Sequence, residues 1–308
     1  MVKIYILDSH ELLITYKIQT MKLRFIVLAF ATLTCQLLNA QHFQDCETAF
    51  PICDKKTYHF DVLNGHGTIE EPIAKTRCFE GSSAKETNSV WLKWVILKKG
   101  ILTFIIDPVD KSNDFDFILY KKGKNCTLIE EVRCMASGNN IGGIDEKLNC
   151  LGKTGLRLNS GDDFEKLGCK YNDDNFLKFL SAEKEEEYVL LVNNYDSQDG
   201  FSISFGGTAE FKETLDCGFV SSTEHVKITS LYPNPVNDEI SIQYVTDKED
   251  LYTIQLLNVK GENIKSLSGY SKIGVNSKSL NVQNLTSGTY ILQLKQGNYS
   301  TARKFVKN

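Results

Sequence analysis

The sequence predicts an all-β protein with two β-sandwich domains behind an N-terminal signal peptide. Three observations predict this class. Short runs rich in aromatic and β-branched residues recur along the chain, each bounded by Gly, Asn, Asp or Lys. No long segment keeps the 3.6-residue period of a helix. With 308 residues, of which 42% are apolar, the chain is long enough for two hydrophobic cores.

The first segment with a clear role begins at Met21. Lys22 and Arg24 precede a mostly apolar run over residues 25–38, and cleavage is expected after Ala40. This layout is typical of a secretory signal peptide, and the apolar run is too short and too interrupted for a stable membrane span. Residues 1–40 are therefore expected to be absent from the mature protein.

Two further features of this region allow different interpretations. Residues 1–20 contain acidic residues that a signal peptide does not need, so we interpret them as an upstream extension and Met21 as the true start. Cys35 would be a lipoprotein anchor in an alternative interpretation. Thr34 before it fits poorly with the small residue that lipoprotein processing prefers, so we favour the plain signal peptide.

Cysteine usage agrees with export. The mature chain keeps eight cysteines, and an even number in an exported chain predicts a disulfide framework. No C-x-x-C pair is present, so a zinc–thiolate site is not expected. The spacing leaves the connectivity open, and we favour the sequence-near pair Cys126 and Cys134 as one bridge. The predicted disulfide cysteines are Cys46, Cys53, Cys78, Cys126, Cys134, Cys150, Cys169 and Cys217.

Charge is divided unevenly along the chain. The net charge is −4, yet residues 232–308 carry +3 and residues 1–40 carry +2, so residues 41–231 carry −9. An acidic passenger argues against nucleic acid and anionic membrane surfaces as partners.

The passenger domain, residues 41–211, is predicted to be a jelly-roll-like antiparallel sandwich. Trp91 and Trp94 are three residues apart and so lie on opposite faces of one strand, with one in the core and the other at an edge or surface. Residues 138–187 are predicted to form long loops with one short helix near NFLKFL. The predicted strands are KTYHFDV, SVWLKWVI, GILTFIID, FDFILYKK, EYVLLVNN and GFSISFGG.

Residues 212–231 are polar and weakly patterned, so we interpret them as a linker that Cys217 ties back to the passenger. The second domain, residues 232–308, opens with YPNPV. Its two prolines fix φ and remove backbone donors, which predicts a stiff, extended entry segment before an alternating strand. Turn signals then divide the rest into about six or seven strands of a small Ig-like sandwich.

Three motifs in this second domain carry a resemblance. They are YPNPV at Tyr232–Val236, SGTYILQL at Ser287–Leu294 and the terminal RKFVKN. In this order, behind a signal peptide, they resemble the type A C-terminal sorting domain of the type IX secretion system of Bacteroidetes. The resemblance implies sorting-motif roles for Tyr232, Pro233, Asn234, Pro235, Gly288, Tyr290, Lys304 and Lys307.

This resemblance also implies partners and a location. The expected partners are an outer-membrane translocon and a sortase-like protease that removes the tail. The passenger would then be secreted or attached to the outer cell surface, by way of the periplasm. It would not be integral to the membrane.

Residues 46–209 resemble the pre-peptidase C-terminal-like β-sandwich module of secreted proteins. The matching segments are CETAFPIC, NSVWLKWVI, GILTFIIDP, NDFDFILY, VRC, TGL and YVLLVNNYDSQDGFSISFGGTA. The segment after TGL is longer here than is usual, so the stretch around 172–179 is expected to vary. The resemblance implies an accessory or adhesive module rather than a catalyst.

Catalytic patterns are missing from the sequence. The mature histidines His42, His59, His66 and His225 form no H-E-x-x-H or H-x-H arrangement, and no serine lies in a G-x-S-x-G elbow. With its cysteines expected to be bridged, the passenger lacks a thiolate for a Cys–His pair. We therefore expect no catalytic residues and no enzyme activity.

One constellation in the passenger suggests a calcium site. Two acidic residues alternate in NDFDFILY and face the same way, and a later loop, NNYDSQDG, adds further oxygen ligands. The alternative, which we favour, is that these residues hydrogen-bond their own turns. The candidate metal ligands are Asp114, Asp116, Asn194, Asp196 and Asp199.

Together these observations predict a secreted or cell-surface, non-catalytic binding or adhesion module with an unknown glycan or protein ligand. The alternative is an accessory substrate-binding component, for carbohydrate or protein, of a secreted hydrolase system. Calcium is the only cofactor that the residues suggest.

Overall fold

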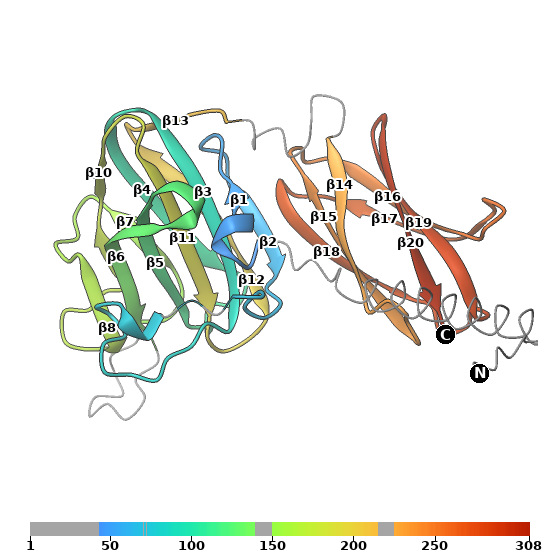
Figure 1. Ribbon diagram of the computed structural model, residues 1–308, viewed down its shortest axis with the longest axis horizontal. Coiled ribbons are helices and arrows are strands. Elements are labelled where there is room, and N and C mark those ends of the chain that lie inside the picture. The colour runs from blue at the N-terminus through green and yellow to red at the C-terminus, as the bar shows by residue number, and fades with distance from the viewer. Residues whose placement is uncertain (1–42, 70, 72, 139–149, 215–224) are drawn as a thin grey trace, which may run out of the picture. The chain divides into compact units, whose positions relative to one another are not determined.

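The computed structural model describes residues 43–69, 71, 73–138, 150–214 and 225–308. Within these ranges the regular elements are strands and three 3-10 turns, so the predicted all-β class is confirmed (Figure 1). No helix in this part of the chain is long and apolar enough to cross a membrane. The 3-10 turns are η2 (Cys46–Thr48), η3 (Ile73–Lys75) and η4 (Lys124–Cys126).

The first passenger sheet has the order β1-β3-β11-β5-β6-β8, with β13 paired to β3. Its centre is antiparallel, and Leu190 lies between Leu92 and Leu119 in register. The strands are β1 (Phe50–Pro51), β3 (Asn88–Lys98), β5 (Phe115–Lys122), β6 (Leu128–Ser137), β8 (Phe164–Gly168), β11 (Glu187–Asn194) and β13 (Glu210–Phe211).

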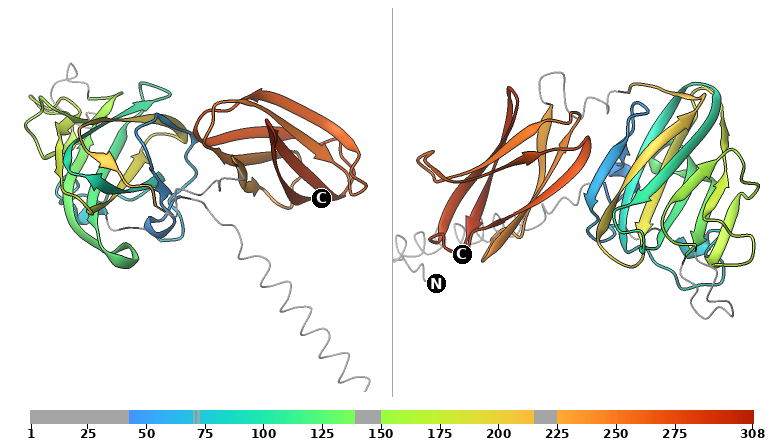
Figure 2. Two further views of the ribbon diagram at one scale, coloured as in Figure 1. Left: turned by 90° about the horizontal axis from the view of Figure 1, so that it is seen from above. Right: turned by 180° about the vertical axis from the view of Figure 1, so that it is seen from behind.

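The second passenger sheet has the order β2-β12-β4-β7-β9, with β10 paired to β4. It faces the first sheet across the passenger (Figure 2). The strands are β2 (Tyr58–Val62), β4 (Gly100–Pro108), β7 (Thr154–Arg157), β9 (Phe176–Lys178), β10 (Leu180–Ala182) and β12 (Asp199–Gly207).

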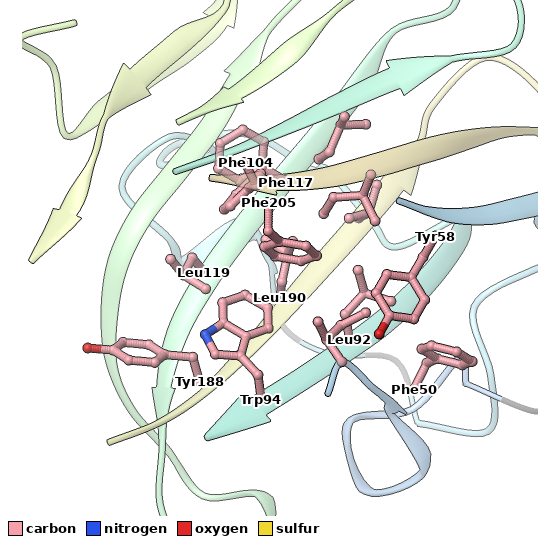
Figure 3. Packing of buried hydrophobic residues seen from close by; sticks show 14 of the residues in the cluster. Phe50, Tyr58, Leu92, Trp94, Phe104, Phe117, Leu119, Tyr188, Leu190 and Phe205 are labelled. Atoms are coloured by element: carbon pink, nitrogen blue, oxygen red, sulfur yellow. The ribbon is translucent and has the colours of Figure 1, made fainter. Parts of the chain in front are cut away.

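An aromatic-rich core fills the space between these two sheets. Phe104 of the second sheet meets Phe117 of the first edge to face, with ring centroids 5.3 Å apart. Trp94 packs against Phe205 at 5.6 Å (Figure 3). Burial of such side chains contributes roughly 1.5–3 kcal/mol each, so this layer stabilises the packing of the two sheets.

The first sheet is buried on its outer face as well. Trp91 is 0% exposed and Trp94 is 3% exposed, so the expectation that one of them lies at an edge or surface is wrong. The segment before β3 covers the outer face, where Trp91 packs with Phe79 and Ile118. Strands buried on both faces lose the alternation of apolar and polar residues, which explains the continuous VWL run.

Disulfides fasten this outer layer to the sheet. Cys46 is bonded to Cys126 and Cys78 to Cys134, while Cys150 and Cys169 form a further bridge. Cys53 is also disulfide-bonded. Cys217 lies outside the described residues.

The favoured Cys126–Cys134 pairing is therefore wrong. Cys134 lies inside β6, and an extended strand from Leu128 to Cys134 spans about 20 Å. A disulfide needs Cα atoms roughly 4.4–6.8 Å apart. Two cysteines that are eight residues apart with an extended strand between them are thus too far apart in space to form a disulfide.

The region 138–187 is more regular than predicted in its described part. NFLKFL forms β9 and the start of β10 instead of a helix. Leu177 is buried beside exposed Lys178 in β9, and Leu180 and Ala182 are buried on either side of exposed Ser181 in β10, as expected of strand alternation. Because the run is so short, its apolar pattern does not distinguish helix from strand.

The C-terminal strands form a second sandwich of two sheets. One sheet has the order β14-β15-β18, and β18 also pairs with β2 over two residues. The other has the order β17-β16-β19-β20. The strands are β14 (Val226–Tyr232), β15 (Glu239–Thr246), β16 (Leu251–Leu257), β17 (Asn263–Tyr270), β18 (Gly274–Asn281), β19 (Gly288–Gln296) and β20 (Tyr299–Lys307).

The start of this second sandwich differs from the predicted boundary. β14 begins at Val226, inside the predicted linker 212–231, and pairs with β15 along its length. Val226 and Ile228 belong to the core of this sandwich. The prolines of YPNPV therefore stand between β14 and β15 and are not the entry to the first strand.

Candidate functional site

The start of β5 presents acidic side chains to one face of the first sheet. Phe115 and Phe117 point into the core between the two sheets, so Asp116 points to the outer face, as predicted from the alternation. Asp116 lies opposite Asn193 of β11 in register. It is 4% exposed.

A cavity of about 490 Å³ lies over this acidic end of the sheet. The loop after η3 forms one wall, β6 and β8 supply a second, and the loop after β11 supplies a third. Its volume falls in the range of small-ligand sites. The lining residues are Phe79, Ser82, Ser83, Ala84, Lys85, Thr87, Asp114, Asp116, Ala136, Leu167, Gly168 and Tyr195.

Asp116 is the most unusual residue of this cavity. Among the described residues its carboxyl group has no hydrogen-bond or ion-pair partner. Burial raises its pKa well above the usual range, and the nearby charges of Asp114 and Asp196 act in the same direction. A buried polar group without a partner costs free energy. A ligand that hydrogen-bonds to Asp116 would remove this cost.

Asp114 is held by the loop after β11. Its backbone N–H donates to Asp196 Oδ2 at 3.0 Å, and its carbonyl accepts the N–H of Tyr195 at 3.0 Å. Gly138 leaves room for the Asp114 carboxyl group, because a Cβ at residue 138 would lie 1.8 Å from Asp114 Oδ1. The two predicted loops therefore do meet at one end of the sandwich.

The side chains of the remaining two predicted calcium ligands hydrogen-bond within the protein, Asn194 to its own turn and Asp199 to the segment before β5. Asn194 Oδ1 accepts the N–H groups of Asp196 and Ser197, both at 3.1 Å. Asp199 Oδ2 accepts from Asn113 Nδ2 at 3.2 Å. In the part of the chain that the structure describes, no group of three or more His, Cys, Asp or Glu is arranged to hold a metal ion. The calcium site stays a prediction.

Sequence reasoning missed the other walls of the cavity. Ser83, Leu167 and Tyr195 line it from three separate loops or strands. Their closeness depends on how the disulfide-fastened segment folds over the sheet, and no local pattern indicates that. Of these three residues, only Tyr195 could have been identified from the sequence, because it lies between Asn194 and Asp196, two of the predicted calcium ligands.

A second buried acid lies beneath the disulfide-fastened layer. Glu86 accepts hydrogen bonds from Trp91 Nε1 at 3.1 Å and from the Ser89 hydroxyl at 2.5 Å. Burial, the hydrogen bond to Glu71 and the charge of Glu71 together raise the pKa of Glu86 to about 9. Burial also raises the pKa of Glu71, but its hydrogen bond to Glu86 lowers it. Glu86 is therefore the residue of this carboxyl pair that holds the proton.

The YPNPV segment contacts the end of the chain. Asn234 Oδ1 accepts the backbone N–H of Val306 at 2.9 Å. Val236 donates its N–H to the Val306 carbonyl at 2.9 Å and accepts that of Asn308 at 3.0 Å. Pro233 and Pro235 flank Asn234, so the opening and closing motifs of the domain form one structural unit.

The third motif packs into the same sandwich. Tyr290 is 6% exposed, stacks on Phe305 at 5.8 Å and donates its hydroxyl to the Thr286 carbonyl at 2.8 Å. Gly288 begins β19 with φ of +155°, and nothing lies within 4 Å of the place a Cβ would take. Lys304 is exposed, whereas Lys307 is buried and bridges to Val236.

Comparison with known families identifies this second sandwich. Residues 230–308 match the family described as the secretion system C-terminal sorting domain. This segment is a type IX sorting domain. The protein is accordingly one that the type IX secretion system exports, which places it outside the cell or on the outer surface. No curated protein matches the chain.

Two of the solved structures that match the chain illustrate a distant likeness. A biofilm-associated protein domain has 10% identity and a TM-score of 0.24, covering 83% of this chain and 52% of that one. Dimeric latent PorU from Porphyromonas gingivalis has 10% identity and a TM-score of 0.25, covering 71% and 31%. The chain thus spans about half or less of these proteins, and the likeness carries no functional argument.

Proposed function

We propose that this protein is a non-catalytic binding protein whose passenger holds a ligand in the cavity at Asp116. The observation that carries the proposal is the Asp116 carboxyl group, which is buried, faces the cavity and lacks a partner among the described residues. Such a group is stabilised when a ligand hydrogen-bonds or neutralises it. The sorting domain supports a ligand on the outside of the cell.

The composition of the cavity supports binding over catalysis. Its lining combines apolar walls with hydroxyl and carboxyl groups and includes no histidine or cysteine among the described residues. Ligand sites usually pair apolar walls with a few fixed polar groups in this way. The Cys78–Cys134 bridge joins the segment that forms one wall of the cavity to β6, which supplies another.

Arrays of glycans and proteins test the proposal. A protein comprising residues 41–308, the chain without its expected signal peptide, is expected to bind one class of ligand. Asp116→Asn is expected to weaken that binding. Asp162→Asn, which removes one charge at an exposed position before β8, should leave the binding unchanged. Absence of binding to both arrays, or binding that is indifferent to Asp116→Asn, would contradict the proposal.

The same arrays separate adhesion from the accessory role. Binding confined to an insoluble polysaccharide or to a protein substrate of secreted hydrolases would favour an accessory component of such a system. Binding to a component of the same cell's surface would favour adhesion.

A further inference from the structure

We infer that the cavity at Asp116 receives the guanidinium group of an arginine side chain from a partner protein. This inference rests on the proposed function and names the chemical class of its ligand. Three properties of the cavity support it: its charge, its walls and its size.

The buried end of the cavity is acidic. Asp114 and Asp116 both line it, and Asp196 lies directly behind Asp114, whose N–H it accepts. Lys85 is the one basic residue among the described lining residues and is exposed. A cationic ligand would stabilise the ionised form of Asp116, which burial disfavours, and a neutral ligand would not.

The walls favour an organic cation over a metal ion. Phe79, Ala136 and Leu167 offer no side-chain oxygen, whereas calcium requires six to eight oxygens. Within the described ranges no group of three or more acidic, His or Cys residues is placed to hold a metal. A methylene stem with a cationic end fits walls of this kind, with the stem on the apolar side chains and the charge at Asp116.

Among organic cations the guanidinium group fits best. It is planar, is more weakly hydrated than an ammonium group and donates two parallel hydrogen bonds to a carboxylate. Tyr195 is 49% exposed and lines the cavity, so its ring is accessible for stacking with a planar cation. A volume of about 490 Å³ admits an arginine side chain together with part of its backbone.

The test uses NMR titration of residues 41–308 with matched small probes. N-acetyl-arginine methylamide carries the charge, and N-acetyl-citrulline methylamide is its neutral isostere. The arginine probe should give saturable shifts at residues lining the cavity, and the citrulline probe should give none. Asp116→Asn should weaken binding of the arginine probe about tenfold or more, and Asp162→Asn should not.

A second variant tests the inference independently, in case Asp116→Asn does not fold. Ser83 is exposed and lines the cavity, so Ser83→Trp should block the cavity without disturbing the core and should also abolish the arginine shifts. Equal binding of both probes, retention of binding in Asp116→Asn, or saturable calcium binding in place of the arginine probe would overturn the inference.

The outcomes distinguish this inference from the proposed function. If the arrays report a ligand that depends on Asp116 while the arginine probe fails to saturate, only the guanidinium assignment is overturned. If the arrays also report no ligand, the proposed function fails with it.

Discussion

The Asn234 side chain, near the start of the sorting domain, accepts the backbone N–H of Val306, near its end, at 2.9 Å. The opening motif of the domain is thus bonded to its last strand. Asn234 lies between Pro233 and Pro235 in a bend that joins β14 to β15, and each proline fixes its own φ. The motifs that the sequence shows separately are parts of one folded unit.

Asn234→Ala should remove this hydrogen bond and lower the stability of the sorting sandwich by about 1 kcal/mol. Chemical denaturation monitored by circular dichroism measures the change. Asn284→Ala, at an exposed position, is the control and should change stability little. Identical denaturation curves for the wild type and Asn234→Ala would show that the contact contributes nothing.

The strand β14 should be part of the export signal. A reporter fused to residues 226–308 is expected to leave the cell, because β14 pairs with β15 and contributes Val226 and Ile228 to the core of the sorting sandwich. A fusion to residues 232–308 lacks most of β14 and should stay largely in the periplasm. Fractionation and immunoblotting measure the distribution.

A deletion of residues 226–308 from the native chain is the matched control for these fusions. It should leave the passenger in the periplasm, since the sorting domain provides the recognition for the type IX system. Equal export of both fusions would place the signal wholly within residues 232–308. Equal amounts of passenger outside the cell with and without the deletion would refute the sorting role itself.

The sequence predicted the class, the two sandwiches and the acidic end of β5, because these follow from local alternation and turn residues. Asp116 and Phe117 illustrate this, since the period of two alone places them on opposite faces. It did not predict the outer layer over Trp91 or the walls around Asp116. Those depend on contacts between distant segments, and the bridge from Cys78 to Cys134 is one example.

Removing the Cys78–Cys134 bridge should loosen the outer layer. The double variant Cys78→Ser, Cys134→Ser is expected to lose roughly 2–4 kcal/mol of stability, since the bridge closes a 56-residue separation. Non-reducing peptide mapping of the wild type should first yield the pairs Cys46–Cys126, Cys78–Cys134 and Cys150–Cys169. A peptide linking Cys126 to Cys134 would contradict this connectivity.

The stability of the passenger should fall as the pH rises through the pKa of Glu86. The folded pKa of about 9 lies above the ordinary 4.5, so the folded state binds this proton more tightly than the unfolded state. Its contribution is fully present below 4.5 and is lost as the pH rises through about 9. Glu86→Gln imitates the protonated form and should flatten this slope.

Tryptophan fluorescence during denaturation at several pH values measures that slope, since Trp91 donates to Glu86. Glu47→Gln, at an exposed position, is the matched control and should keep the wild-type slope. Parallel slopes for the wild type and Glu86→Gln would show that Glu86 is not the titrating group.

Gly138→Ala should disturb the cavity through Asp114. A Cβ at residue 138 would lie 1.8 Å from Asp114 Oδ1 and 2.1 Å from Oδ2, and Asp114 is itself buried and bonded to the loop after β11. The carboxyl group must therefore move, at a cost of about 1–3 kcal/mol. Gly161→Ala meets nothing within 4 Å and should leave stability nearly unchanged. Thermal unfolding measures both variants, and binding to the arginine probe should fall only in Gly138→Ala. If Gly138→Ala unfolds and binds as the wild type does, Asp114 does not need the position that the structure gives it.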